Sequence, residues 1–173
     1  MKIEKYAVPC VMGIDPGLRN TGFGIISFSK NRFSCFEYGT IFTPQGLTQG
    51  ERLLIIFDKI SALIKKYKPC EAGIETLYFA KNVSSAMGVS EARGVVLLSL
   101  AQMGVRVFEY APNTIKKAVT GIATAEKRQV QEAVKLLLGL HKIPETDHAA
   151  DALAAAITKI NLGDVGEGLC LTV

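Results

Sequence analysis

A single acidic residue at the end of an apolar run constrains this chain more than any other feature. Residues Val8 to Ile26 read VPCVMGIDPGLRNTGFGII, two apolar runs joined by a glycine-rich turn. Asp15 closes the first run, and Pro16 ends the strand. A carboxylate beside a buried strand is costly unless a cation or hydrogen-bond donors compensate it. The segment therefore predicts a strand that offers Asp15 to a metal ion, with ordinary Asp-Pro-Gly turn chemistry as the alternative.

Length and composition favour one compact domain. The chain has 173 residues, of which 49% are hydrophobic, enough to bury a core. We expect a single domain over residues 1–173, with a glycine-rich, disordered tail over about 163–173. No run approaches the ~20 apolar residues of a membrane span, and the start of the chain is too interrupted for a signal peptide. The sequence therefore predicts a cytoplasmic protein without membrane contact.

The spacing of apolar residues predicts an α/β fold. Alternation and short apolar runs predict strands over residues 8–14, 21–29, 32–42, 72–75 and 105–110. Three- and four-residue spacing predicts helices over 49–67, about 82–103, 113–119, 124–138 and 147–160, with Asn113 and Thr124 as caps. This order predicts a five-stranded mixed sheet, three strands antiparallel and two parallel, with helices on both faces.

Three further polar residues stand at the ends of predicted elements. Glu75 ends the strand AGIE, while His148 and Asp151 interrupt the alanine-rich start of the last helix, TDHAADALAAAI. His148 and Asp151 are three positions apart, about 60° around the helix, and so share a face. Asp147 shares the face of Asp151 and is a rival ligand. Oxygen-rich ligands without a thiolate favour Mg²⁺ or Mn²⁺ over Zn²⁺, although separate structural roles, such as pairing with lysine or capping, remain the alternative.

Five segments together resemble the bacterial Holliday-junction resolvases of the RuvC type. They are GIDPGLRNTGFGI, IETLYFAKNVSSAMGVSEARG, FEYAPNTIKKAVTG, ATAEKRQV and DHAADALAAAI, in the order and spacing of that family, from about Val11 to Ile160. The resemblance implies an RNase H-like fold and a two-fold dimer. It also implies Mg²⁺-dependent cutting of four-way DNA junctions by paired symmetric nicks, leaving 5′-phosphate and 3′-hydroxyl ends.

The same resemblance implies the catalytic residues. The family's catalytic acids correspond to Asp15, Glu75 and Asp151, and its fourth position, commonly an aspartate, falls on His148. An imidazole is a softer ligand than a carboxylate and suits Mn²⁺ better than Mg²⁺. The resemblance implies two Mg²⁺ ions per site, and because of the imidazole we expect Mn²⁺ to support activity as well. His148 is expected to be a ligand rather than a general base, with Asp147 as its possible substitute.

The resemblance also implies a DNA surface and partners. Lys116 and Lys127 match basic positions of the family near the scissile phosphate, and Lys81 and Arg93 are weaker candidates. Tyr78 matches an aromatic residue near the junction centre, and Phe79 is adjacent to it. Viewed alone, the basic window that holds Lys116 and Lys127 favours an ordinary solvated helix surface over a DNA-binding patch. A branch-migration motor of the RuvA and RuvB type is the implied partner. The expected dimer interface is the long helix after Ala80, with candidates Val89, Val95, Val96, Leu97 and Leu100 unless these belong to the core.

Three rival functions remain at this stage. Actin-like nucleotide-binding proteins also open with a strand followed by an Asp, Gly and Thr turn, but they need a second domain that this chain is too short to supply. A junction-binding protein that keeps the fold without catalysis would not need the acids. A related RNase H-like nuclease acting on RNA or on another branched DNA would keep them.

Overall fold

The structure is a computed structural model in which residues 9–76 and 83–163 are described. Its strands are β1 (Cys10–Asp15), β2 (Asn20–Ser29), β3 (Arg32–Phe42), β4 (Glu71–Glu75) and β5 (Arg106–Tyr110). Its helices are α1 (Gln49–Tyr67), α2 (Val83–Gln102), α3 (Pro112–Thr120), α4 (Lys127–Leu138) and α5 (Asp147–Leu162). From residue 164 on, the tail that the sequence predicts to be disordered lies outside the described residues. None of the described helices has the length and apolarity that a membrane crossing requires.

The five strands form one mixed sheet in the order β3-β2-β1-β4-β5. β1 and β3 both pair antiparallel with β2, whereas β4 pairs parallel with β1, and β5 pairs parallel with β4. The predicted division into three antiparallel strands and two parallel ones is therefore confirmed. β1 is central and runs parallel to β4, so Asp15 and Glu75 end their strands at the same edge of the sheet.

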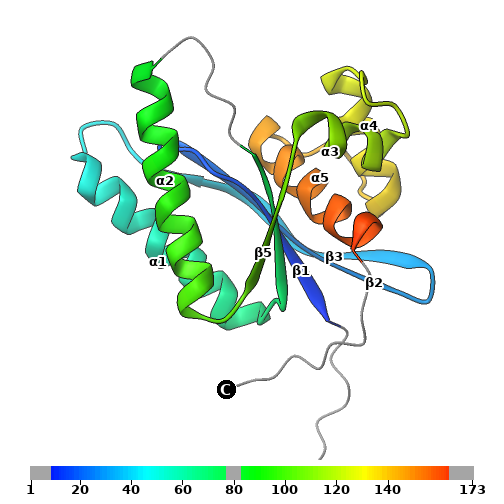
Figure 1. Cartoon of the computed structure of the whole chain (residues 1–173), viewed down its shortest axis with the longest axis horizontal. Coiled ribbons are helices and arrows are strands. Elements are labelled where there is room, and N and C mark those ends of the chain that lie inside the picture. The colour runs from blue at the N-terminus through cyan, green and yellow to red at the C-terminus, as the bar shows by residue number, and fades with distance from the viewer. Residues whose placement is uncertain (1–8, 77–82, 164–173) are drawn as a thin grey trace, which may run out of the picture.

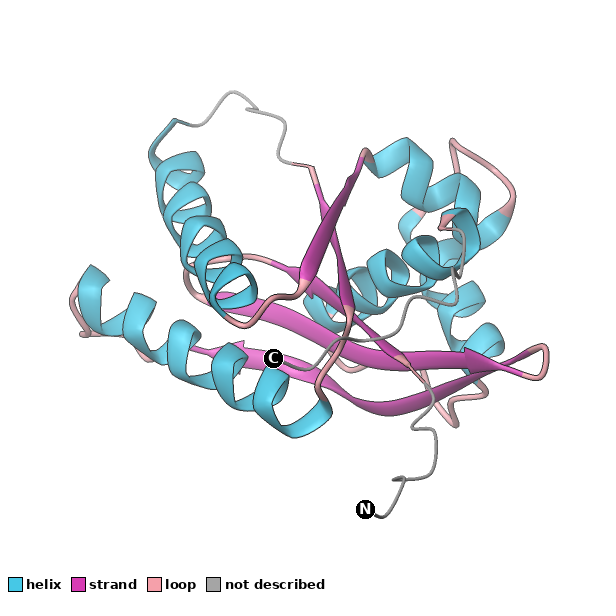
Figure 2. Ribbon diagram, turned by 60° about the horizontal axis from the view of Figure 1, so that its bottom comes forward, coloured by secondary structure: helices cyan, strands magenta, loops and turns pink. Residues whose placement is uncertain are grey.

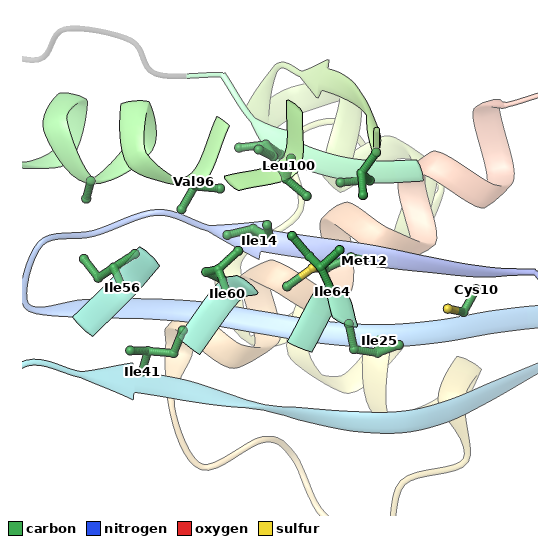
Figure 3. Close-up of a cluster of buried hydrophobic side chains, with 14 residues drawn as sticks. Cys10, Met12, Ile14, Ile25, Ile41, Ile56, Ile60, Ile64, Val96 and Leu100 are labelled. Carbon is green, nitrogen blue, oxygen red and sulfur yellow. The ribbon is translucent and has the colours of Figure 1, made fainter. Parts of the chain in front are cut away.

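Helices cover both faces of the sheet, as predicted. α1 and α2 lie on one face, and α3, α4 and α5 lie on the other (Figures 1 and 2). Figure 3 shows the first of these interfaces, where strand residues such as Met12 and Ile25 meet Ile60 of α1 and Leu100 of α2. Each of these four side chains is fully buried. Together, the helices on the two faces bury the apolar residues of β1 and β2.

α5 lies unusually close to the sheet because small residues face each other across the contact. A Cβ added to Gly13 of β1 would come within 1.8 Å of the Ala152 carbonyl oxygen. One added to Gly22 of β2 would come within 1.9 Å of the His148 carbonyl oxygen. Only glycine permits such an approach of two backbones. The alanine-rich sequence of α5 is thus explained by packing, and its first turn is held over the end of β1.

Two predicted helix caps are wrong. Asn113 lies inside α3, whose N-cap is Ala111, since Pro112 occupies the first turn. Thr124 precedes the start of α4, which is capped instead by Glu126 in a reciprocal arrangement with Gln129. In both cases a neighbouring residue takes care of the unpaired N–H groups of the first turn. In α3, proline has no N–H that needs a partner. In α4, the glutamate side chain accepts a hydrogen bond from a first-turn N–H. These errors shift boundaries by a few residues and leave the order of elements unchanged.

Two of the predicted interface residues belong to the core. Val96 and Leu100 on α2 are fully buried against the sheet and α1. Val89, Val95 and Leu97 are half-buried, and Val95 and Leu97 pack against this same core, so each offers only part of its surface to an intermolecular contact. The exposed apolar residues of the described part of α2 also include Met87 and Leu98, at 61% and 60% exposure. The apolar residues of the helix are spread around its axis, so its sequence alone does not show which face is buried.

Candidate active site

Asp15 and Glu75 reach the site from adjacent parallel strands. The β1–β4 register places Ile14 opposite Ile74, so the acid that follows each isoleucine lies at the same edge of the sheet. Burial raises the pKa of the Glu75 carboxyl to about 7, and the negative charges of Asp15 and Asp151 act in the same direction. Like charges are therefore gathered here at an electrostatic cost, which a bound cation would relieve.

His148 arrives from the opposite direction, on the first turn of α5. Thr146 caps this helix by accepting a hydrogen bond from the Ala149 N–H. The His148 backbone lies over Gly22, and Gly22 is the register partner of Asp15 in the β1–β2 pair. As a result, His148 Nδ1 donates to Asp15 Oδ2 over 2.7 Å. That hydrogen bond raises the pKa of the imidazole, against the effect of its partial burial.

Asp151 lies one turn further along the same face of α5. Its side chain is 34% exposed, and Lys127 Nζ of α4 lies 3.6 Å from its Oδ2. Burial raises the pKa of Asp151, whereas the charge of Lys127 opposes that rise. A carboxylate in this position is only partly compensated, which makes it available as a ligand.

Asp147 points toward α4. Its carboxylate accepts hydrogen bonds from Lys127 Nζ at 2.9 Å and from Gln131 Nε2 at 2.8 Å. The hydrogen bond from Lys127 lowers the pKa of Asp147, and its side chain is 60% exposed. Asp147 therefore already has a lysine and an amide as partners, whereas His148 is bonded directly to Asp15.

The donor set suits a hard divalent cation. Three carboxylates and one imidazole from β1, β4 and α5 influence one another electrostatically, and no thiolate takes part. Within residues 9–76 and 83–163, no three acidic, histidine or cysteine side chains are already arranged as a closed metal cluster. The imidazole and the ammonium group of Lys127 instead provide positive charge beside the acids. The chemistry of these residues fits a divalent cation.

Basic residues surround the acids, and their surroundings differ. The charges of Lys116 and Lys127 both act to lower the pKa of Glu75, which places each within electrostatic reach of it. Lys127, 54% exposed, is paired with Asp147 and Asp151. Arg93, the weaker candidate, has a side chain that is only 12% exposed, and its Nη2 is paired with Glu109. Three more of the predicted DNA contacts, Tyr78, Phe79 and Lys81, lie outside the described residues.

Sequence reasoning missed one contact made by Arg93. Its Nη1 donates to the main-chain oxygen of Glu75 over 3.0 Å, so an arginine of α2 reaches the site through the backbone. Residue type and spacing carry no signal for such a bond. Only a buried arginine on the inward side of an otherwise apolar helix hints that it has a specific partner.

The family model and the two relatives compared below carry the same protein description. A family model described as crossover junction endodeoxyribonuclease RuvC matches residues 11–159. The crossover junction endodeoxyribonuclease RuvC of Treponema denticola is 80% identical over 164 residues, which cover 95% of this chain and 92% of that protein. The RuvC of Treponema pallidum (strain Nichols) is 53% identical over 154 residues, covering 89% of this chain and 79% of that protein.

Solved structures agree with the fold. The structure of T. thermophilus RuvC in complex with Holliday junction substrate is 29% identical, with a TM-score of 0.84, and the match covers 88% of this chain and 93% of that one. The yeast mitochondrial Holliday junction resolvase Ydc2 has a TM-score of 0.64 over 92% of this chain and 80% of that one. At 13% identity, the likeness to Ydc2 concerns the fold alone.

Proposed function

Since the chain belongs to the RuvC family of crossover junction endodeoxyribonucleases, we propose that it resolves four-way (Holliday) DNA junctions by paired symmetric nicks. The observation that carries this proposal is the convergence of Asp15, Glu75 and Asp151, from three separate elements, at one edge of the sheet. Carboxylates collected at such a cost are what a metal-dependent nuclease needs and what a protein that only binds junctions does not. The T. thermophilus relative, described in complex with a Holliday junction substrate, supports the same choice of substrate.

Asp15, Glu75, His148 and Asp151 would hold two divalent cations, Mg²⁺ by preference and Mn²⁺ as a substitute. Bound there, such ions would neutralise charge on the phosphate and promote formation of the nucleophile. Asp15 would be the central residue of this ligand set, because β1 lies between β2 and β4 in the sheet. Glu75 then flanks it on the β4 side, and His148 flanks it over β2.

The reaction is a phosphodiester hydrolysis. The oxygen of a water molecule bonds to phosphorus and loses a proton, while the bond from phosphorus to the 3′ oxygen breaks and that oxygen gains a proton. The products would be a 5′-phosphate and a 3′-hydroxyl, a nick that a ligase can seal. His148 acts as a ligand in this proposal rather than as the base, because the matching family position normally holds a ligand.

Lys116 and Lys127 would contact phosphates beside the cut. Lys127, which is paired with Asp147 and Asp151, would have to leave these partners to reach a phosphate. Lys81 would add a further phosphate contact, and Tyr78, with Phe79 beside it, would stack on an unpaired base near the junction centre. Such contacts give affinity without reading sequence, and they weaken steeply with salt.

Two symmetric cuts require two sites, and a two-fold dimer supplies them with the symmetry of the junction. We place the dimer interface on α2, where Met87 and Leu98 are exposed and Val89, Val95 and Leu97 are half-buried. As an enzyme of bacterial recombination, the protein would act in the cytoplasm with a branch-migration motor of the RuvA and RuvB type. We further propose that the chain acts as a single nuclease domain.

The test is cleavage of a labelled synthetic four-way junction, with linear duplex of the same sequence as the control. We expect paired symmetric nicks on the junction alone, in Mg²⁺ and in Mn²⁺, and none with EDTA. Asp15→Asn should abolish cutting while junction binding in EDTA stays intact. Failure to bind the junction, or equal cutting of linear duplex, would contradict the proposed substrate.

A further inference from the structure

The peptide group that follows Glu75 is held from two sides. Its N–H, which belongs to Thr76, donates to the Tyr110 carbonyl of β5 over 2.8 Å. Its carbonyl, which belongs to Glu75, accepts from Arg93 Nη1 over 3.0 Å. Because the two polar groups of a peptide point in opposite directions, these two bonds fix the plane of the peptide. The carboxylate of Glu75 is carried by the residue whose orientation is fixed in this way.

Strand geometry explains why an arginine is needed there. In a parallel ladder, successive residues direct their backbone groups alternately to the two neighbouring strands. Thr76 faces β5, so the carbonyl of Glu75 faces β1, where the register ends at the Ile14–Ile74 pair. If the β1–β4 ladder continued, the N–H of residue 16 would donate to this carbonyl, but residue 16 is a proline and has no N–H. Arg93 provides the hydrogen bond that β1 cannot.

The guanidinium itself is held in place. Arg93 Nη2 lies 2.6 Å from Glu109 Oε1 of β5, and the arginine side chain is only 12% exposed. The neighbouring residues Ala92 and Val96 are fully buried, so α2 is fixed against the sheet on both sides of Arg93. A guanidinium has a planar fork of donors and can therefore bridge a carbonyl and a carboxylate, which the single ammonium group of lysine does less well.

We propose that Arg93 is a positioning residue of the nuclease site, which orients Glu75 through its backbone and ties that orientation to α2. This inference rests on the proposed role of Glu75 as a metal ligand. Arg93 touches neither substrate nor cation, so its loss should change the fit of the site to its cation while leaving the affinity for DNA unchanged. It also gives α2, the helix that we assign to the dimer, a direct mechanical link to the cutting centre.

Arg93→Gln in the full-length protein is the first test. We expect kcat for junction cutting to fall by about a hundredfold, the scale of a small misplacement of a reacting group. The Mg²⁺ concentration for half-maximal rate should rise, and the junction Kd in EDTA should stay unchanged. Arg93→Lys should restore little of the rate. The matched control is Arg106→Gln, which breaks an arginine–glutamate pair at Glu71, at the opposite end of β4, and should alter none of these three quantities.

Two readouts do not depend on activity. Amide exchange of the Thr76 N–H, followed by NMR, should accelerate in Arg93→Gln relative to the Ile74 N–H in the same strand. Mn²⁺ binding, measured by calorimetry, should weaken. If Arg93→Gln does not fold, Glu109→Gln, which keeps Arg93 and loosens only its anchor, should still raise the Mg²⁺ requirement.

The outcomes separate this inference from the proposed function. A wild-type protein that fails to cut junctions would contradict the function, while faster Thr76 exchange and weaker Mn²⁺ binding would still support the role of Arg93. Conversely, wild-type exchange, wild-type metal requirement and full activity in Arg93→Gln or Arg93→Lys would overturn the inference alone.

Discussion

His148 Nδ1 lies 2.7 Å from Asp15 Oδ2, which joins the first turn of α5 directly to the end of β1. The two residues are 133 positions apart in the sequence. Their contact exists because Gly22, the register partner of Asp15, lets the α5 backbone approach the sheet at His148. His148 is therefore located at the centre of the candidate site.

His148→Asp should shift the metal preference toward Mg²⁺. A carboxylate is a harder ligand than an imidazole, so the ratio of cutting rates in Mg²⁺ and in Mn²⁺ should rise severalfold. The measurement is the single-turnover rate on a four-way junction in each metal. Asp147→Asn is the control, since Asp147 is bonded to Lys127 and Gln131, and it should leave the ratio unchanged. An unaltered ratio in His148→Asp would remove His148 from the ligand set.

Lys127→Met should impair cutting far more than Lys117→Met. Each substitution removes one exposed positive charge, so the general electrostatic attraction to the junction should fall by a similar amount in both variants. Only Lys127 lies 3.6 Å from Asp151 and opposes the rise in its pKa. We expect a loss in kcat of about a hundredfold for Lys127→Met, on the scale of one positioned charge. Equal losses in both variants would show that Lys127 acts only as a phosphate contact.

Glu75 should make the metal-free protein less stable as the pH rises. Its pKa of about 7 exceeds the ordinary 4.5, so between these values the folded state binds more protons than the unfolded state. The stability that this difference contributes is complete below about pH 4.5 and is lost as the pH rises through about 7. In the wild type we expect the free energy of unfolding to fall by on the order of 2 kcal/mol across this pH range, and we expect Glu75→Gln to abolish that fall.

Urea denaturation in EDTA at several pH values measures this effect. Asp147→Asn is the contrasting variant, because the hydrogen bond from Lys127 lowers the pKa of Asp147 below the ordinary 3.8. The stability that Asp147 contributes is present above its unfolded pKa and is lost only as the pH falls further. Its removal should therefore leave the slope between pH 4.5 and 7 as in the wild type, and a parallel change in both variants would contradict the assignment to Glu75.

Gly22→Ala should both destabilise the protein and reduce its activity. The added Cβ would stand 1.9 Å from the His148 carbonyl oxygen, so α5 would have to move at the turn that carries His148 and Asp151. We expect a loss of at least about 3 kcal/mol in the free energy of unfolding, by urea denaturation. Gly50→Ala in α1, with no atom within 4 Å of its added Cβ, should be neutral or slightly stabilising.

Glu71→Gln should destabilise the protein without touching the site. Lys159 of α5 has a side chain only 3% exposed, and its Nζ lies 2.7 Å from Glu71 Oε2. Removing one partner of a buried pair leaves the other charge uncompensated, at a cost of about 3–5 kcal/mol. Glu132→Gln, which breaks the exposed pair with Arg128, should cost less than about 1 kcal/mol. Similar losses in the two variants, by urea denaturation, would show that burial of Lys159 carries no such cost.

The fold was largely predictable because its signals are local. Alternation over residues 32–42 and three- to four-residue spacing over 49–67 report the periods of strand and helix, and both elements begin and end where predicted. The cap predictions at Asn113 and Thr124 were wrong because several neighbouring residues compete to satisfy one helix end. The sequence of α2 did not predict which face of the helix is buried, because its apolar residues are spread around the axis. The structure alone separates the core residues Val96 and Leu100 from the exposed Leu98.

The sequence by itself determined the order of strands and helices, the family, and the placement of Asp15 and Glu75 at strand ends, because these follow from residue type and short-range spacing. The tertiary structure alone decided which side chains meet: His148 with Asp15, Lys127 with Asp147 and Asp151, and Arg93 with the Glu75 carbonyl. Each of these contacts joins separate elements and depends on strand register and on how closely a helix approaches the sheet. Strand register and the distance between helix and sheet are set by the packing of the whole domain, so short-range sequence patterns do not predict them.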